Sequence, residues 1–172
     1  MIVMPLGRKT ARLNKRDYIG KGVYFFTVCC ARRLPHFSEP ESANNTIQAL
    51  LDTASAKSLR IVAYSVMPDR LHMLAEGTSE KSDALEFIRI FKQRSAFEFR
   101  QRRGQTLWEL SYYDRVVRSS DSIIEIARYI WWNPVRKKLC HRPQEYPHSG
   151  SQTFSWMKEA QIPPRSCLSW PV

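Results

Sequence analysis

The chain of 172 residues is long enough for one domain with a substantial hydrophobic core. Its 27 lysines and arginines outnumber its 16 acidic residues, and the formal net charge of +11 favours a polyanionic partner, most often nucleic acid. No apolar run approaches the roughly 20 residues that a membrane span requires, and four cysteines without C-x-x-C spacing fit a reducing compartment, so we expect a cytoplasmic protein without a membrane partner.

The first half of the chain alternates between strand and helix patterns. Residues 1–20 are basic and polar and are expected to form an N-terminal arm. Aromatic and β-branched residues predict a strand over about 22–30. A proline followed by an acidic residue opens a predicted helix over about 40–57. Two further strand patterns follow at about 59–67 and 70–76.

The second half begins with a long amphipathic helix pattern over about 82–103, followed by a strand near 112–118. A helix is expected over about 121–132, and Asn133-Pro134 either breaks it or starts a new turn. Beyond Arg142 the chain is rich in proline, and we expect irregular structure there with tryptophan anchors.

The first six predicted elements follow the order βαββαβ. This is the order of a ferredoxin-like α+β sandwich with an antiparallel sheet, here followed by a further helix. We divide the chain into a basic arm over residues 1–20, one domain over residues 21–150 and a C-terminal tail over residues 151–172.

The helix over 82–103 has a strongly basic surface. Its cations outnumber its two acidic residues, Glu86 and Glu98, and a phosphate-facing role is favoured over a merely solvated face. The predicted phosphate-binding side chains are Arg89, Lys92, Arg94, Arg100, Arg102 and Arg103.

The segment after Met67-Pro68-Asp69 places functional side chains on a strand. Strand side chains alternate between faces, so Arg70 and His72 are expected on one face and Leu71 and Met73 in the core on the other. A strand of this kind presents two functional groups side by side on a rigid support.

This segment resembles the metal-binding strand of the single-tyrosine HUH transposases, in particular the REP-associated tyrosine transposases. Their signature is Met-Pro-(Asp/Asn/Glu)-His-x-His-hydrophobic; here Arg70 stands where the first histidine is expected, and His72 matches the second. Further matches are the segments 24–30, 91–100, 107–108, 111–118, 127–136 and 145–147, so that the resemblance covers about residues 18–150.

The resemblance implies that Tyr129 attacks a phosphodiester of single-stranded or hairpin DNA at repeated palindromic elements, leaving a 5′-phosphotyrosine link. It also implies Mg²⁺ or Mn²⁺ held by the histidines, with Asn133 completing the metal shell. Positions 129 and 133 share a helix face if the helix continues that far. Core packing for Tyr129 and a helix-end cap for Asn133 are the structural alternatives. Relatives occur as monomers and as homodimers.

Arg70 leaves three outcomes open, because a guanidinium stays protonated and cannot ligate a metal. In the first outcome, metal binding and cleavage are lost and a DNA-binding domain remains. In the second, Arg70 clamps the scissile phosphate without any metal. In the third, another residue, such as Asp69 or Glu76, supplies the missing ligand. His72 alone is a weak ligand for Mg²⁺.

Three functions therefore compete: a transposase-like nuclease, a catalytically impaired protein that binds DNA hairpins, and a ferredoxin-like RNA-binding protein. The third is disfavoured, because the aromatic motif typical of RNA-binding sheets is missing from the predicted central strands.

Overall fold

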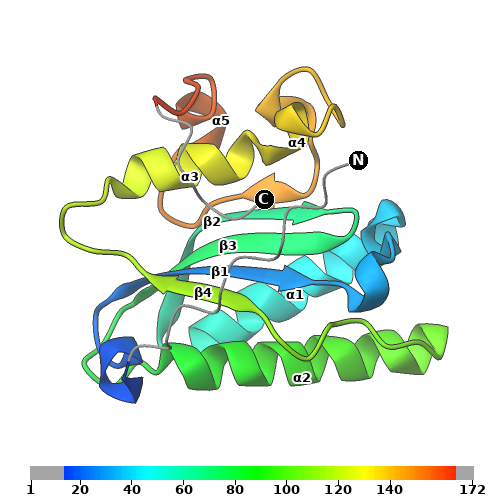
Figure 1. Ribbon diagram of the computed structural model, residues 1–172, viewed down its shortest axis with the longest axis horizontal. Helices are drawn as coiled ribbons and strands as arrows, with labels where there is room; N and C mark the ends of the chain where they lie inside the picture. Colours follow the sequence, from blue (N-terminus) through cyan, green and yellow to red (C-terminus); the bar gives the residue numbers. More distant parts are fainter. Residues whose placement is uncertain (1–13, 166–172) are drawn as a thin grey trace, which may run out of the picture.

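The computed structural model describes residues 14–165, and these form an antiparallel sheet with helices on both faces (Figure 1). The strand order in the sheet is β4-β1-β3-β2-β5. The strands are β1 (Val23–Cys29), β2 (Leu59–Met67), β3 (Arg70–Gly77), β4 (Tyr113–Val116) and β5 (Ser149–Gly150). The predicted ferredoxin-like α+β fold is confirmed, and β5 extends the sheet at the edge of β2. Most of the predicted N-terminal arm, residues 1–13, and the tail from residue 166 lie outside the described residues.

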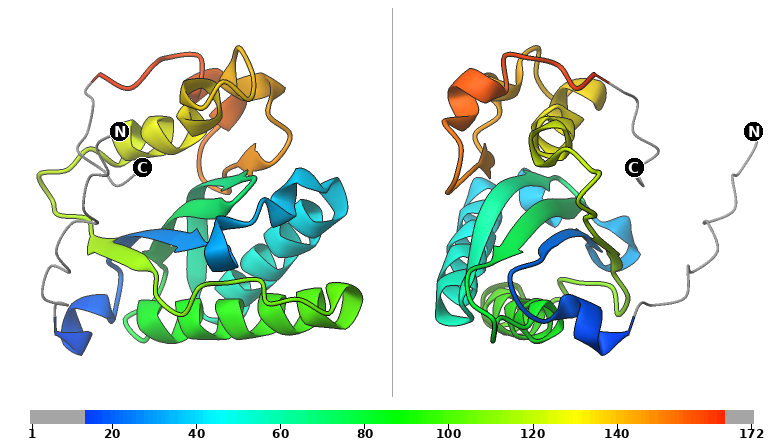
Figure 2. Two further views of the ribbon diagram at one scale, coloured as in Figure 1. Left: turned by 45° about the vertical axis from the view of Figure 1, so that its right-hand side comes forward. Right: turned by 90° about the vertical axis from the view of Figure 1, so that its left-hand side faces the viewer.

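The helices divide between the two faces of the sheet. One face is covered by α1 (Pro40–Ala56) and α2 (Ala84–Arg103), and the other by α3 (Ile123–Trp131). All three views in Figures 1 and 2 show this arrangement. The short helices α4 (Asn133–Arg136) and α5 (Trp156–Glu159) lie on the α3 side. Among residues 14–165, no helix combines the length and the apolar character needed to cross a membrane.

The α1–α2 face is a conventional hydrophobic core. Alternate residues of the strands, such as Phe26 and Leu71, are fully buried against Phe87 and Phe91 of α2. The α2 helix begins where the Asp83 side chain accepts a hydrogen bond from the Glu86 amide at 2.9 Å, and it ends at a left-handed glycine. The long amphipathic pattern thus folds as the sequence predicts.

The α3 face has a second, smaller core. Ile126, Ile130 and Trp131 of α3 pack against the sheet residues Phe25 and Leu74. The pairing of β2 with β3 shifts register between Ile61 and Ala63, and both Val62 and Ala63 belong to this core. A bulge of this kind turns consecutive side chains to one face, and here it widens the apolar floor under α3.

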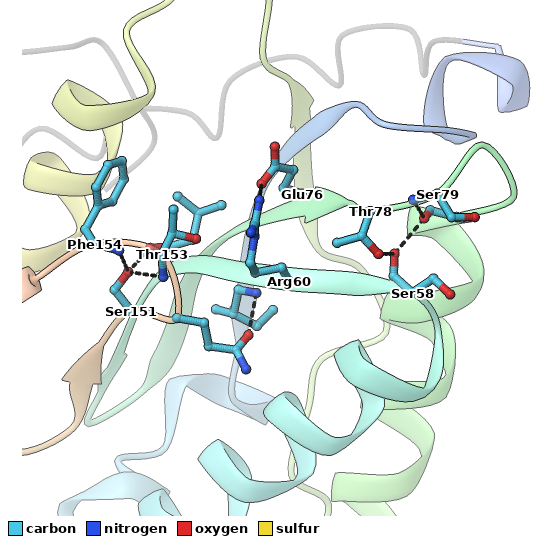
Figure 3. Close-up of polar contacts among 12 residues, drawn as sticks. Ser58, Arg60, Glu76, Thr78, Ser79, Ser151, Thr153 and Phe154 are labelled. Carbon is cyan, nitrogen blue, oxygen red and sulfur yellow. Dashed lines mark hydrogen bonds and ion pairs between the residues drawn. The ribbon is translucent and has the colours of Figure 1, made fainter.

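The chain after Arg142 is more ordered than the proline content suggests, because it folds back over α3. We call residues 143–165 the C-terminal strap. The Ser151 hydroxyl donates to the Val62 carbonyl at 2.6 Å and accepts from the Thr153 and Phe154 amides, which holds the strap against β2 (Figure 3). Phe154 in turn packs edge-on against Trp131.

The strap is also tied to α3 by polar contacts. The Arg128 side chain, 8% exposed, bridges Glu125 of its own helix at 2.7 Å and Glu159 of α5 at 2.8 Å. The Trp132 indole donates to the Ala160 carbonyl at 3.0 Å. The strap and α3 belong to the same chain, so α3 is held on the sheet by contacts within that chain. The position of α3 decides where Tyr129 lies.

Candidate active site

The predicted strand geometry places Arg70 and His72 on the α3 side of the sheet. Leu71 and Met73, which alternate with them, are buried in the α1–α2 core. In the register of the sheet, His72 lies between Thr27 of β1 and Ser65 of β2. The floor of the site is therefore central in the sheet, where backbone pairing on both sides holds it rigid.

The His72 imidazole is fully enclosed, with only 1% of the residue exposed. Its Nδ1 lies 2.8 Å from the Thr27 hydroxyl, and its ring lies over Phe25 at 6.2 Å between centroids. Burial, aided by the positive charges of Arg70 and Arg136, lowers the pKa of His72 to about 3. The imidazole is neutral at physiological pH.

The Arg70 side chain is engaged by its neighbour in sequence. Its Nε and Nη2 donate to the two carboxylate oxygens of Asp69 at 3.0 and 3.1 Å, and Arg33 approaches the same carboxylate at 3.5 Å. Burial alone would raise the pKa of Asp69, but the hydrogen bond and charge of Arg70, with the charge of Arg33, lower it below its usual value. The three side chains form a charge cluster with one net positive charge.

Tyr129 projects from α3 into the interior and is 1% exposed. The guanidinium carbon of Arg136 lies 4.0 Å from the centre of its ring, and Nη2 of Arg136 donates to the Tyr129 carbonyl at 3.0 Å. Burial raises the pKa of the Tyr129 phenol, while the charges of Arg136 and Arg70 oppose that rise. The phenol is protonated at neutral pH, with two cations close enough to favour its ionised form.

Asn133 is buried one turn beyond Tyr129, although α3 itself ends at Trp131. Its amide nitrogen donates to the Tyr129 carbonyl at 3.1 Å, which satisfies a carbonyl at the end of the helix. This contact is the helix-end cap that the sequence left open. The role of Asn133 as a metal ligand stays a prediction.

The donor set around His72 does not fit Mg²⁺ or Mn²⁺. With Nδ1 against the Thr27 hydroxyl, His72 could offer a metal only its Nε2, and the Asp69 carboxylate is occupied by two guanidinium groups. Glu76 pairs with Arg60 at 2.5 Å, as Figure 3 shows. Within residues 14–165, no three His, Cys, Asp or Glu side chains converge into a group that could hold a metal. A dication at this place would face Arg70 and Arg136 with too few oxygen ligands.

The basic residues of α2 lie on the opposite face of the sheet from Tyr129 (Figures 1 and 2). Arg89 pairs with Glu86, and Arg94 pairs with Glu98 and with Asp52 of α1. The other four are Lys92, which is half-buried and donates to the carbonyls of residues 109 and 110, Arg103, which pairs with Glu39, and Arg100 and Arg102, which are exposed. The structure does not bring these cations to the tyrosine, and their role in phosphate binding stays a prediction.

Some residues of the site carry no signal in the sequence. Thr27 looks like an ordinary strand residue, and Arg33 lies 36 positions before Asp69 in a turn that follows β1. Arg136 belongs to α4, beyond the end of α3. A search for cations two helical turns beyond the tyrosine would have found Arg136, whereas Thr27 and Arg33 need the strand pairing and the turn geometry.

Comparisons with known proteins identify the family of the chain and match its fold. The family model described as transposase IS200 like matches residues 20–133, more than half of the chain. A Haemophilus influenzae protein assigned as a REP-associated tyrosine transposase is 24% identical over 148 residues, covering 78% of this chain and 82% of that protein. The solved structure of a REP-associated tyrosine transposase bound to a REP hairpin aligns with a TM-score of 0.65 and 21% identity, over 82% of this chain and 81% of its own. A Deinococcus radiodurans protein assigned as a transposase aligns with a TM-score of 0.50 and 25% identity, over 67% and 88%.

Proposed function

Because the chain belongs to the family of IS200-like transposases, we propose that it binds hairpin DNA through its basic surface and does not cleave it by a metal-dependent route. The observation that carries this proposal is the bidentate contact of Arg70 with Asp69. In the resemblance on which the site was predicted, the position of Arg70 holds the first metal-binding histidine. The side chain present there cannot ligate a metal, and it also engages the nearest carboxylate.

Hairpin DNA is the partner that the charge and the relatives support. The excess of 11 positive charges suits a polyanion. A structural relative with the same fold is bound to a REP hairpin. Preference for a DNA hairpin over single-stranded RNA of the same length would separate this proposal from an RNA-binding function, and the affinity should fall steeply as the salt concentration rises.

The test measures binding and strand cleavage on one set of substrates. A labelled library of DNA hairpins with single-stranded flanks is incubated with Mn²⁺, with Mg²⁺ and with chelator. The wild type, Tyr129→Phe and Arg70→His are compared side by side. We expect all three proteins to bind and the wild type to give no product with either metal. Metal-dependent product from the wild type that disappears in Tyr129→Phe would overturn the proposal.

A second candidate function is metal-free cleavage. It is favoured by the stacking of Arg136 on Tyr129, because this guanidinium and that of Arg70 both stabilise a phenolate. In this step the Tyr129 oxygen forms a bond to phosphorus as the bond from phosphorus to the 3′ oxygen breaks. The phenol proton passes to solvent, and the 3′ oxygen takes up a proton. Product that depends on Tyr129 and survives chelation would select this candidate.

A further inference from the structure

The turn that follows α4 is the most basic exposed segment on the α3 side. We call residues 136–142 the α4 turn. It contains the exposed side chains of Arg136, Lys137, Lys138 and Arg142. The stretch from residue 132 to residue 150 contains a single acidic residue, Glu145. Its Oε1 lies 3.8 Å from Nε of Arg142. The positive charge of this segment is therefore largely uncompensated, in contrast to that of Arg89, Arg94 and Arg103 of α2, which form ion pairs.

The backbone of the α4 turn is held in one conformation. The Lys138 amide donates to the Val135 carbonyl and the Leu139 amide to the Pro134 carbonyl, both at 2.9 Å. This is a Schellman cap, in which the residue at the position of Lys138 adopts a left-handed conformation, here with φ of 58°. Glycine is the favoured residue at such a position, so a lysine there costs conformational energy.

Two further left-handed cations follow the end of β1. Arg32 and Arg33 have φ of 54° and 56°. Among residues 14–165, four residues other than glycine have positive φ, and three of them are these two arginines and Lys138. Left-handed side chains other than glycine concentrate at functional sites, where their strain is retained for a purpose.

Both turns belong to the end of the sheet at which the site lies. Arg33 contacts Asp69 at 3.5 Å in the turn between β2 and β3, and Arg136 stacks on Tyr129 at 4.0 Å. In Figure 1 this is the end of the sheet at which β1 terminates and above which α4 lies. The positive charges of Arg33 and Arg136 both contribute to lowering the pKa of His72.

From this arrangement we propose that the α4 turn, together with Arg32 and Arg33, is the surface that binds the backbone phosphates of the DNA. The proposal rests on the proposed binding of hairpin DNA and names the surface responsible. It replaces the α2 helix as the phosphate-binding element. Because the backbone of the two turns is already held by hydrogen bonds, it loses little freedom when their cations contact phosphates, which favours binding.

The Lys138→Gly variant tests this proposal, because glycine keeps the left-handed turn and removes the charge. We expect it to bind a DNA hairpin about three- to tenfold more weakly, and Lys137→Gln/Lys138→Gly more weakly still. The slope of log K against log salt should become shallower by about 0.9 for each phosphate that the variant no longer neutralises. The melting temperature should not fall, since the substitution relieves strain.

Two control variants make the result specific. Lys81→Gln removes an exposed cation from the turn before α2, and Ser58→Gly changes the fourth left-handed residue without changing charge. Both should bind like the wild type. A blunt hairpin and one with a single-stranded flank are used in parallel. Weakening on both assigns the contacts to the stem, and weakening on the flanked substrate alone assigns them to the flank.

The proposal is overturned if the wild type binds hairpins while the Lys137 and Lys138 variants keep wild-type affinity and salt slope. It is also overturned if Arg100→Gln/Arg102→Gln on α2 weakens binding as strongly as the α4-turn variants do. A wild type that binds no hairpin at all would instead remove the proposed function itself, so the two failures are distinguishable.

Discussion

The two faces of the sheet bury different kinds of side chain. Between the sheet and α1–α2, the described residues bury apolar groups and small hydroxyls, such as Thr53 and Ser95, which donate to carbonyls of their own helices. On the α3 side the buried residues include an imidazole, a guanidinium and an amide, namely His72, Arg128 and Asn133. The first face is a core that any well-packed apolar set could fill. The second face retains polar groups whose contribution depends on the positions that they occupy.

The largest expected effect concerns the apolar face. Phe91→Ala should lower the free energy of unfolding by about 3–5 kcal/mol, because the ring is fully buried between α2 and the sheet and its removal leaves a cavity. Denaturant unfolding of both proteins measures the loss. Phe97→Ala is the matched control on the same helix, since Phe97 is 64% exposed, and it should change stability by less than about 0.5 kcal/mol. Equal losses in the two variants would contradict the assignment of this core.

This difference between the faces explains how much the sequence alone could predict. The period-two and helical patterns predicted the strands and helices from β1 to α3 nearly to the residue, whereas β5 and α5 lie in a region expected to be irregular. The alternation of Arg70 and His72 with Leu71 and Met73 placed both polar side chains on one face. Apolar patterning carries this information locally, because each element must bury one face.

The remainder of the site depends on contacts between distant segments. The Asp52 and Glu39 partners of the α2 arginines come from α1 and its preceding residue, so counting charges along α2 overestimated its free positive charge. The strap contacts with α3 join residues about 30 positions apart, and proline content does not reveal them. Arg136 lies two helical turns beyond Tyr129, but its contact with that ring crosses the break between α3 and α4, so the spacing alone did not establish it.

The next largest effect is expected from a variant that breaks the charge cluster of Asp69, Arg70 and Arg33. Asp69→Asn keeps the size of the side chain but removes the negative charge that Arg70 and Arg33 share. We expect a loss of about 1.5–3 kcal/mol in unfolding free energy, the range for hydrogen bonds to charged groups. Hairpin affinity should rise at low salt, because the site gains a net positive charge. Titration of a labelled hairpin at two salt concentrations measures the affinity, and an unchanged or lower affinity would contradict the placement of the DNA near Arg33, which contacts Asp69.

Stability should depend on pH through the α3 face. The folded pKa of His72 is about 3, below the ordinary value of 6.5, so between these values the unfolded chain binds the proton. The stabilisation is complete above pH 6.5 and is lost as the pH falls toward 3. From pH 7 to pH 5 the loss from this one group is about 2 kcal/mol. Denaturant unfolding of the wild type and of His72→Gln at both pH values isolates the contribution of His72. Equal losses of stability in the two proteins would refute this prediction.

The smallest effect concerns one hydrogen bond in the floor of the site. Thr27→Val is nearly isosteric and favours a strand, but it removes the hydroxyl that lies 2.8 Å from Nδ1 of His72. The imidazole cannot turn to solvent, because it is 1% exposed, so its Nδ1 would lose its partner. We expect a loss of about 1–2 kcal/mol in unfolding free energy. Thr27→Ser keeps the hydroxyl and removes only a methyl group, so it should retain the hydrogen bond and give the same imidazole NMR signal of His72 as the wild type. If the valine variant were as stable as the wild type, the hydroxyl would not hold His72, and the placement of this polar group on the α3 face would not contribute to stability.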